Sequence, residues 1–330
     1  MKLSTDYLGL RLKNPIMPGA SPMADDLGHV KRLEDAGAAA IVMHSLFEEQ
    51  IIMEQRAVEH HVEAHNEGFA EATTFFPSSD EFDRTCDQYL DQVQKIKAAV
   101  SVPLIGSLNG ITSGGWASYA QLIQEAGADA LELNYYDLPA DPDQTGSDVE
   151  KRALEMVRSI RKEVSIPIAV KLSPFFSSLP NFVKQLVGAG ANGVVLFNRF
   201  YQPDIDVENL DVMPVLELSS PAELRVRLRW LAILSARVET SYSATGGVHS
   251  AQDVVRAIMA GAHTVQLVSA LLRFGPEHLK TVLAELTEWL EAHEYESVEQ
   301  MRGAMNLKHC PDVTSFERAN YLRILHGWQI

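Results

Sequence analysis

Residues 188–191, Gly-Ala-Gly-Ala, and the apolar run Gly193–Phe197 that follows them decide the fold of this chain. A glycine in such a turn adopts the positive φ that ends a helix, and an unbroken apolar run is typical of a strand buried on both faces. The pattern therefore predicts a joint between a helix and a parallel strand. It occurs three more times, at Asp35–Ala38 before Ala40–Met43, at Glu125–Ala128 before Ala130–Leu133, and at Met259–Ala262 before Thr264–Val268.

Four further strands complete a regular alternation. Three of them include a proline near their start, where no ladder donor is needed, and these are Asn14–Met17, Val102–Ile105 and Ile166–Val170. The fourth is Ser241–Val248. Helical patterns lie between the strands, among them 115–125, 149–163, 180–188, 221–236, 251–259 and 276–292. Eight alternations predict an α/β fold, a (β/α)8 TIM barrel, with a doubly wound open sheet as the alternative.

The length of 330 residues suits one barrel domain over residues 1–330. Two connections after strands are long, namely Glu48–Arg84 after the second strand and Tyr201–Ser219 after the sixth. Both are predicted to stand over the carboxyl-terminal face, where barrel active sites form. The C-terminal segment 294–330 is predicted to pack on the barrel or on a partner subunit. Its aromatic residues include Tyr295, Phe316, Tyr321 and Trp328.

Composition limits the partners and the location. Lys and Arg number 28 against 44 Asp and Glu, so the formal net charge of -16 opposes binding of nucleic acid and of anionic lipid. An anionic ligand therefore needs local donors. The first residues show no signal-peptide pattern, and no apolar run is long enough to span a membrane. We expect a cytoplasmic protein without a membrane partner.

Metal binding is not predicted. Cys86 and Cys310 lack the paired spacing of zinc and iron–sulfur sites. His61 and His65 stand one helical turn apart, but no second cluster completes a coordination sphere. A solvated helix face is therefore the preferred interpretation of these two histidines.

Polar or small residues follow nearly every predicted strand. Because the carboxyl ends of barrel strands surround the active site, these residues are the candidate site. In strand order they are Gly19, Ala20 and Ser21, then His44 and Ser45, Ser107 and Asn109, Asn134 and Asp137, Lys171 and Ser173, Asn198 and Arg199, Gly246 and Gly247, and Val268 and Ser269.

Two of these strand ends indicate a specific chemistry. Lys171 follows an apolar run, so its ammonium group is predicted in a partly desolvated mouth, where it needs an anionic partner. An ion pair at the barrel rim is the alternative. Gly246 and Gly247 leave backbone N–H groups open before a predicted helix, and with Ser269 they predict the phosphate-binding cup common among barrels. A tight turn is the alternative for the two glycines.

The ordered motifs resemble the dihydroorotate dehydrogenase family and the related flavin domain of dihydropyrimidine dehydrogenase, which are FMN-dependent barrels. The resemblance runs from Leu8–Pro15 to Gln266–Leu271 and is most specific at Glu132–Asn134, Val170–Pro174 and Ala244–Ser250. It implies bound FMN and hydride transfer between the flavin and a small, pyrimidine-like or unsaturated substrate.

The resemblance also implies roles for single residues. Lys171 would stand at the N1/O2 edge of the flavin, where a cation stabilises the reduced anionic ring. Asn134 and Asn198 would orient the substrate through their amide groups. The residues expected to bind FMN are Gly19, Ala20, Ser21, Ser45, Asn109, Asn134, Lys171, Gly246, Gly247, Val268 and Ser269.

Two positions depart from the family pattern. Asp137 stands where the family has a Cys or Ser catalytic base, and His44 stands where a flavin-contacting lysine is usual. Both departures argue against dihydroorotate itself as the substrate. Asp137 is the candidate proton-transfer group, because a buried carboxylate can serve as the base for a C–H proton. A loop residue that caps its neighbours is the alternative.

Two other functions fit the same residues. In a Schiff-base aldolase acting on a phosphorylated substrate, Lys171 would be the nucleophile. In a non-catalytic relative, FMN would be bound without turnover. From the resemblance we also expect a homodimer. The electron acceptor is not identified, and an iron–sulfur partner would be a separate chain.

Overall fold

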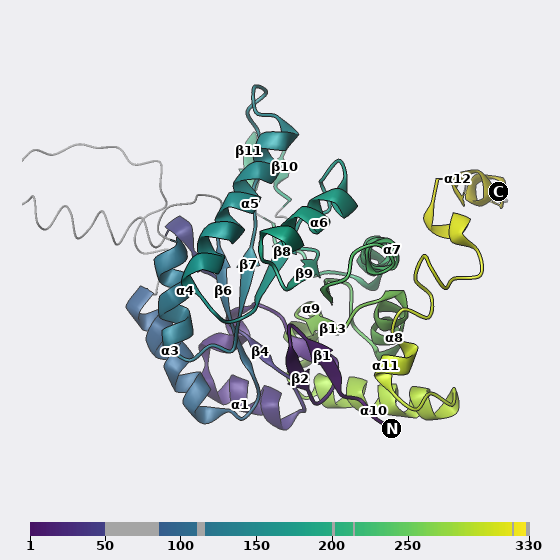
Figure 1. Ribbon diagram of the computed structural model, residues 1–330, viewed down its shortest axis with the longest axis horizontal. Coiled ribbons are helices and arrows are strands. Elements are labelled where there is room, and N and C mark those ends of the chain that lie inside the picture. The colour runs from purple at the N-terminus through teal and green to yellow at the C-terminus, as the bar shows by residue number, and fades with distance from the viewer. Residues whose placement is uncertain (50–85, 111–115, 200–201, 214, 319, 328–330) are drawn as a thin grey trace, which may run out of the picture.

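The computed structural model describes residues 1–49, 86–110, 116–199, 202–213, 215–318 and 320–327. Among these residues, the main sheet is parallel and runs in the order β3-β13-β12-β9-β8-β7-β6-β4. The backbone N–H of Ala39 donates to the carbonyl of Ile16 at 2.9 Å and joins the first strand to the second. The predicted TIM barrel is confirmed (Figure 1). Its strands are β3 (Ile16–Pro18), β4 (Ile41–Val42), β6 (Leu104–Asn109), β7 (Ala130–Asn134), β8 (Ile168–Leu172), β9 (Gly193–Leu196), β12 (Ser241–Thr245) and β13 (Thr264–Leu267).

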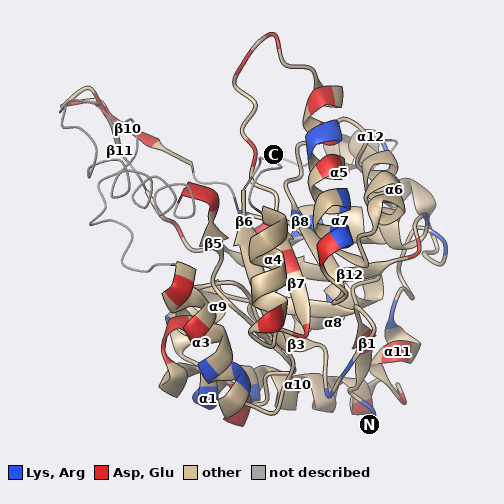
Figure 2. Ribbon diagram, turned by 60° about the vertical axis from the view of Figure 1, so that its left-hand side comes forward, with Lys and Arg blue, Asp and Glu red and all other residues tan. Residues whose placement is uncertain are grey.

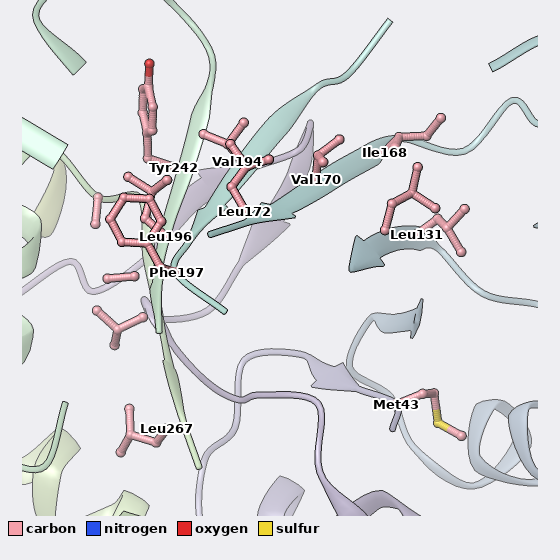
Figure 3. Packing of buried hydrophobic residues seen from close by; sticks show 14 of the residues in the cluster. Met43, Leu131, Ile168, Val170, Leu172, Val194, Leu196, Phe197, Tyr242 and Leu267 are labelled. Atoms are coloured by element: carbon pink, nitrogen blue, oxygen red, sulfur yellow. The ribbon is translucent and has the colours of Figure 1, made fainter. Parts of the chain in front are cut away.

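Helices cover the outer face of the barrel. Outward-facing strand residues such as Leu131, Ile168 and Val194 pack under them in the main hydrophobic core (Figure 3). This layering buries both faces of each strand, which explains the unbroken apolar runs in the sequence. The helices are α1 (Leu27–Asp35), α3 (Cys86–Ala99), α4 (Trp116–Glu125), α5 (Gly146–Glu163), α6 (Leu179–Ala189), α7 (Leu224–Ser235), α8 (Ala251–Ala260), α9 (Ser269–Phe274) and α10 (His278–Ala292).

The glycines of the four helix-to-strand joints have the backbone conformation predicted for them. Gly37, Gly127, Gly190 and Gly261 have φ values of 104°, 105°, 112° and 119°. A side chain is strained at these angles, and glycine is not. Each joint therefore depends on its glycine, and the four-fold pattern in the sequence does mark four αβ turns.

A short hairpin closes the amino-terminal end of the barrel. It consists of β1 (Thr5–Tyr7) and β2 (Leu10–Leu12), and it packs on inward-facing residues such as Met17 and Val195 in a second apolar cluster. At the same end, Nδ1 of His263 accepts the backbone N–H of Tyr242 at 3.1 Å. Burial lowers the pKa of His263 to about 4, which keeps this acceptor nitrogen unprotonated.

The second barrel strand is interrupted. After β4 the chain resumes pairing with β6 only at β5 (Leu46–Phe47). In the gap, the hydroxyl of Tyr89 on α3 donates to the carbonyl of Ser107 at 3.1 Å and accepts its N–H at 3.0 Å. A side chain thus satisfies the backbone groups that the missing strand partner leaves open.

The two long connections differ in what the structure describes. Most of Glu48–Arg84 lies outside the described residues. The connection Tyr201–Ser219 contains an antiparallel hairpin of β10 (Asp204–Asp206) and β11 (Asp211–Met213), which projects from the barrel (Figure 1). The sequence did not predict this hairpin.

The C-terminal segment is only partly packed on the barrel. Ser297 pairs with Lys2, and Leu307 donates its N–H to the carbonyl of Ala232 on α7 at 2.9 Å. Tyr295 stacks on Trp289 of α10, and Phe316 is half-buried against the core. Farther along lie α11 (Val298–Met301), the short 3-10 helix η4 (Val313–Phe316) and α12 (Asn320–Gly327). Figure 1 shows α12 at a distance from the barrel, and Trp328 lies outside the described residues.

Charged residues lie mostly on the helices and loops around the barrel, and the strands carry few of them (Figure 2). In the part of the chain that the structure describes, none of the helices combines the length and the apolar character needed to cross a membrane.

Candidate active site

Four buried polar atoms near the carboxyl ends of the strands have no hydrogen-bond partner among the described residues. A buried polar atom without a partner costs about 1–3 kcal/mol, so a ligand or a water molecule that pairs with such an atom gains by doing so. They come from four different barrel strands or the loops directly after them. The atoms are Oγ of Ser21, Oδ1 of Asn134, Nδ2 of Asn198 and Oε1 of Gln266.

A cavity of about 240 Å³ opens at this end of the barrel. It brings together most of the residues that the sequence predicted to bind a cofactor or substrate, from strands 1, 5, 6, 7 and 8. The predicted residues that line it are Ala20, Ser21, Lys171, Asn198, Gly246, Gly247, Val268 and Ser269.

Four residues predicted to bind cofactor or substrate do not line this cavity, and three of them follow or end the second, third and fourth barrel strands. The four are Gly19, Ser45, Asn109 and Asn134. Asn109, Asn134 and Lys171 are register partners on β6, β7 and β8, so they stand at one level of the sheet. Ser45 shares a hydrogen bond of 2.8 Å with Ser107 on β6. Gly19 permits close packing, because a Cβ there would lie 2.8 Å from the side chain of Val268.

Lys171 pairs with a buried carboxylate, Glu132, which lies in a motif quoted from the sequence but was given no role there. Its Nζ donates to Oε1 of Glu132 at 3.2 Å, and the two side chains are 7% and 1% exposed. The amide Nε2 of Gln266 donates to Oε2 of the same carboxylate at 2.6 Å. The three residues come from β8, β7 and β13 and form one buried polar network inside the barrel.

The loops after β12 and β13, where the sequence predicts a phosphate-binding cup, meet the loop after β9. Gly246 and Gly247 have φ values of 85° and 82°, and a Cβ on Gly247 would lie 2.5 Å from the backbone nitrogen of Leu224. The hydroxyl of Ser219 accepts the N–H of Gly247 at 3.2 Å and lies 2.9 Å from the hydroxyl of Ser269. The N–H of Gly247 and the hydroxyl of Ser219 are thus paired with neighbours in this structure, and they belong to the types of donor that a phosphate group takes.

A buried cation lies behind this cup. Arg227 on α7 is 7% exposed, and its Nε and Nη1 donate to the carbonyls of Thr245 and Glu223, both at 2.9 Å. The guanidinium packs where a Cβ of Gly246 would stand. Burial lowers the pKa of Arg227, because desolvation disfavours its charged form. A guanidinium still carries its charge at neutral pH, and this charge adds to the positive potential of the cup. Nothing in the sequence pattern distinguished this arginine from others on the same helix.

Asp137 lies in the loop after β7 and is turned toward α5. Its Oδ2 accepts from Nη2 of Arg152 at 2.5 Å and from the hydroxyl of Tyr135 at 2.9 Å. Its side chain is 5% exposed. Burial and the nearby Asp137 charge raise the pKa of Tyr135, so this hydroxyl stays a donor. Asp137 does not line the cavity described above.

His44 is also turned to a neighbour. Its Nδ1 lies 2.5 Å from Oδ1 of Asp25, and its ring meets the ring of Tyr89 edge-on at a centroid distance of 5.2 Å. Asp25 belongs to the short 3-10 helix η1 (Pro22–Asp25), directly after the residues Gly19–Ser21. His44 therefore braces the loop that forms one wall of the cavity.

These features fit a phosphorylated ring cofactor. The cup offers N–H and hydroxyl donors, Gln266 and Lys171 line the space next to it, and the orphaned amide atoms supply donors and acceptors for a heterocycle. The fold and this donor set define the class of protein, a (β/α)8 barrel with a candidate phosphate-binding cup and a buried lysine at its mouth.

Comparison with known proteins agrees with this class and narrows it. The model of the dihydroorotate dehydrogenase family matches residues 81–290. The chain belongs to this family of oxidoreductases, as the resemblance in the sequence had suggested. The enzymes of the family are flavin-dependent and act on CH–CH groups.

Similar proteins come from archaea, plants and bacteria. The catalytic subunit of dihydroorotate dehydrogenase B (NAD+) from Thermoplasma acidophilum is 26% identical over 91% of this chain and 98% of its own length. The chloroplastic dihydropyrimidine dehydrogenase (NADP+) of Arabidopsis thaliana is 21% identical over 91% of this chain and 76% of its own. The NAD-dependent dihydropyrimidine dehydrogenase subunit PreA of Escherichia coli is 22% identical over 92% and 77%.

Proposed function

We propose that the protein binds FMN and catalyses hydride transfer between the flavin and a small pyrimidine-like or unsaturated substrate. The observation that carries this proposal is the cavity in which Lys171 and the phosphate cup of Gly246 and Gly247 open onto one space. Bound FMN supplies the hydride donor or acceptor at its ring N5. The family relationship supports the proposal, because dihydroorotate and dihydropyrimidine dehydrogenases are among the similar proteins.

The residues divide the work between cofactor and substrate. In this proposal the cup holds the 5′-phosphate, and Gly19, Ala20 and Ser21 line the ring. Ser45 and Asn109 complete the cofactor side from the second and third strands, and Val268 and Ser269 complete it from the eighth. Lys171 places a positive charge at the pyrimidine edge of the ring, where negative charge grows on reduction.

Asn134 and Asn198 orient the substrate in this proposal. Oδ1 of Asn134 and Nδ2 of Asn198 are an unpaired acceptor and an unpaired donor, which suits a ring with both N–H and carbonyl groups. A substrate of this kind satisfies both atoms at once. An aliphatic substrate without such groups leaves them unpaired, at a cost of about 1–3 kcal/mol each.

Asp137 is proposed as the proton-transfer group. Both of its hydrogen bonds use Oδ2, so Oδ1 has no hydrogen-bond partner among the described residues. The alternative is that Asp137 only anchors its loop to Arg152. Asp137→Asn separates the two roles, because a lost base lowers turnover about a hundredfold or more. Tyr135→Phe removes the hydroxyl that contacts Asp137 and the carbonyl of Val149, leaves the carboxylate in place, and serves as the control. An equal, small loss in both variants favours the anchor.

The proposal extends to the assembly and the location. We propose a cytoplasmic homodimer that passes electrons to an acceptor carried by another chain. The relative from Thermoplasma acidophilum is named a catalytic subunit, which supports a separate partner. Light scattering of the purified chain measures the mass, and a monomeric mass contradicts the dimer.

The first test is the visible spectrum of the purified protein, followed by acid release and mass identification of the chromophore. FMN is the expected product.

The role of the cup is tested with Arg227→Gln, because loss of the cation should weaken FMN binding about tenfold and riboflavin binding less than twofold. Arg225→Gln, on the exposed face of the same helix, is the matched control. A colourless chain that takes up no FMN sinks the proposal.

A further inference from the structure

The buried network under the cavity contains one charge that no step of the proposed reaction uses. Glu132 is 1% exposed and lies on β7 below the level of Asn134. It does not line the cavity, whereas both of its partners, Lys171 and Gln266, do. A buried carboxylate is costly to keep, and its position directly behind two cavity-lining groups gives it influence over both.

The contacts of Glu132 fix how these two groups face the cavity. An ionised carboxylate is an acceptor only, so the amide of Gln266 must present its Nε2 to Glu132. The amide Oε1 is thereby left as the unpaired atom. On the other carboxylate oxygen, Nζ of Lys171 is held at 3.2 Å, which restricts a long and flexible side chain to one place.

The charge of Glu132 also opposes that of Lys171. A flavin that is reduced gains negative charge, and a lysine ammonium beside it favours this change. A carboxylate paired with the same ammonium offsets part of that effect, since both charges lie in a medium of low dielectric. The pair as a whole is close to neutral, although Lys171 alone is not.

From this arrangement, and resting on the proposed binding of FMN, we propose that Glu132 is a positioning residue that sets the reduction potential of the bound flavin. It acts through Lys171 and Gln266 and does not touch the reacting atoms. Its negative charge keeps the potential lower than Lys171 alone would set it.

The test is the midpoint potential of bound FMN, measured by dye equilibration in the wild-type chain and in Glu132→Gln. The expected result is a positive shift, with the ratio of reduced to oxidised flavin rising about tenfold at a given potential, which is about 30 mV for a two-electron couple. Glu132→Asp keeps the charge and is the matched control, with a potential close to that of the wild type. FMN binding by Glu132→Gln with an unmoved or lower potential overturns the proposal.

A second comparison covers the case in which Glu132→Gln does not fold, because that variant leaves Lys171 buried without its counter-ion. The double variant E132Q/K171Q replaces both charges by amides, and its potential is compared with that of Lys171→Gln. A higher potential in the double variant supports the role of Glu132, and equal potentials overturn it. A wild-type chain that takes up no FMN contradicts the proposed function as well, whereas an unmoved potential contradicts this inference alone.

Discussion

The two ends of the barrel are built from the same strands but treat their polar groups differently. At the amino-terminal end, the hairpin β1–β2 covers the interior, and Nδ1 of His263 has the N–H of Tyr242 as its partner. At the carboxyl-terminal end, polar atoms of Ser21 and Asn198 are buried with no partner among the described residues. The unpartnered atoms of Ser21 and Asn198 carry a cost in stability that a ligand can offset.

The largest expected effect that tests this comparison is a loss of turnover at the carboxyl-terminal end. Lys171→Met should lower turnover about a thousandfold, because it removes the charge that the proposed function places beside the reacting ring. Turnover with the substrate found for the wild type is the measurement, and Lys162→Met, on the exposed surface of α5, is the control. Turnover within tenfold of the wild type contradicts the assigned role. Borohydride trapping of a carbonyl substrate on Lys171 would instead support the aldolase.

The next largest effect is a loss of stability at the amino-terminal end. Leu12 is 1% exposed in the apolar cluster under the barrel. Leu12→Ala should lower the free energy of unfolding by about 3 kcal/mol through lost burial and a cavity. Flavin affinity of the folded variant should change less than threefold, because the residues proposed to bind the cofactor lie at the other end of the barrel. Denaturant unfolding and flavin titration give the two values, and a large loss of affinity with intact stability would reverse the comparison.

A smaller effect is expected from pH. The pKa of His263 is about 4 in the folded chain and about 6.5 when unfolded, so the unfolded chain binds the extra proton as the pH falls below about 6.5. The stability contribution is therefore present at pH 7 and is lost on acidification toward pH 4. Between pH 7 and pH 5 the loss should be roughly 2 kcal/mol. His263→Gln, which keeps an acceptor, should lack this part of the slope. The same slope in both proteins contradicts the assignment.

The smallest expected effect is a loss of flavin affinity, and it is the most direct test of the unpartnered atoms at the carboxyl-terminal end. Oγ of Ser21 is buried without a partner. Ser21→Ala should therefore leave the flavin-free chain as stable as the wild type or slightly more so, and should weaken flavin binding by about 1 kcal/mol, roughly fivefold. Thermal unfolding with and without FMN measures both. A flavin-free variant that is clearly less stable would show that the hydroxyl has a structural partner.

The fold was predictable because its determinants are local. The turn glycines Gly37 and Gly261 carry their conformational requirement in the residue type, and the apolar runs after them are long enough to distinguish strands buried on both faces. The hairpin β10–β11 was missed, because its exposed residues Ile205 and Val212 show no buried face from which a strand pattern could be read.

The site was predictable where it depends on strand ends and not where it depends on distant pairs. Lys171 was predicted because it follows an apolar run, and Gly246 because it begins a Gly-Gly pair between a predicted strand and a predicted helix; both line the cavity. Gln266 and Glu132 are hydrogen-bonded across 134 positions, and no local pattern in one sequence reports such a contact. Asp137 was recognised by its place in a motif, but its partner Arg152 lies on a helix surface, where an arginine is unremarkable.

The hydroxyl of Tyr89, inserted between the second and third strands at Ser107, has a consequence for isotope exchange. Most amide hydrogens of a barrel are shielded from deuterium by a neighbouring strand, but the amide of Ser107 is shielded by a side chain of α3. Its exchange is therefore governed by how often that helix leaves the barrel wall. The exchange rate of this one amide hydrogen thus reports the movement of α3 away from the barrel and the separation of the second and third strands as a single event.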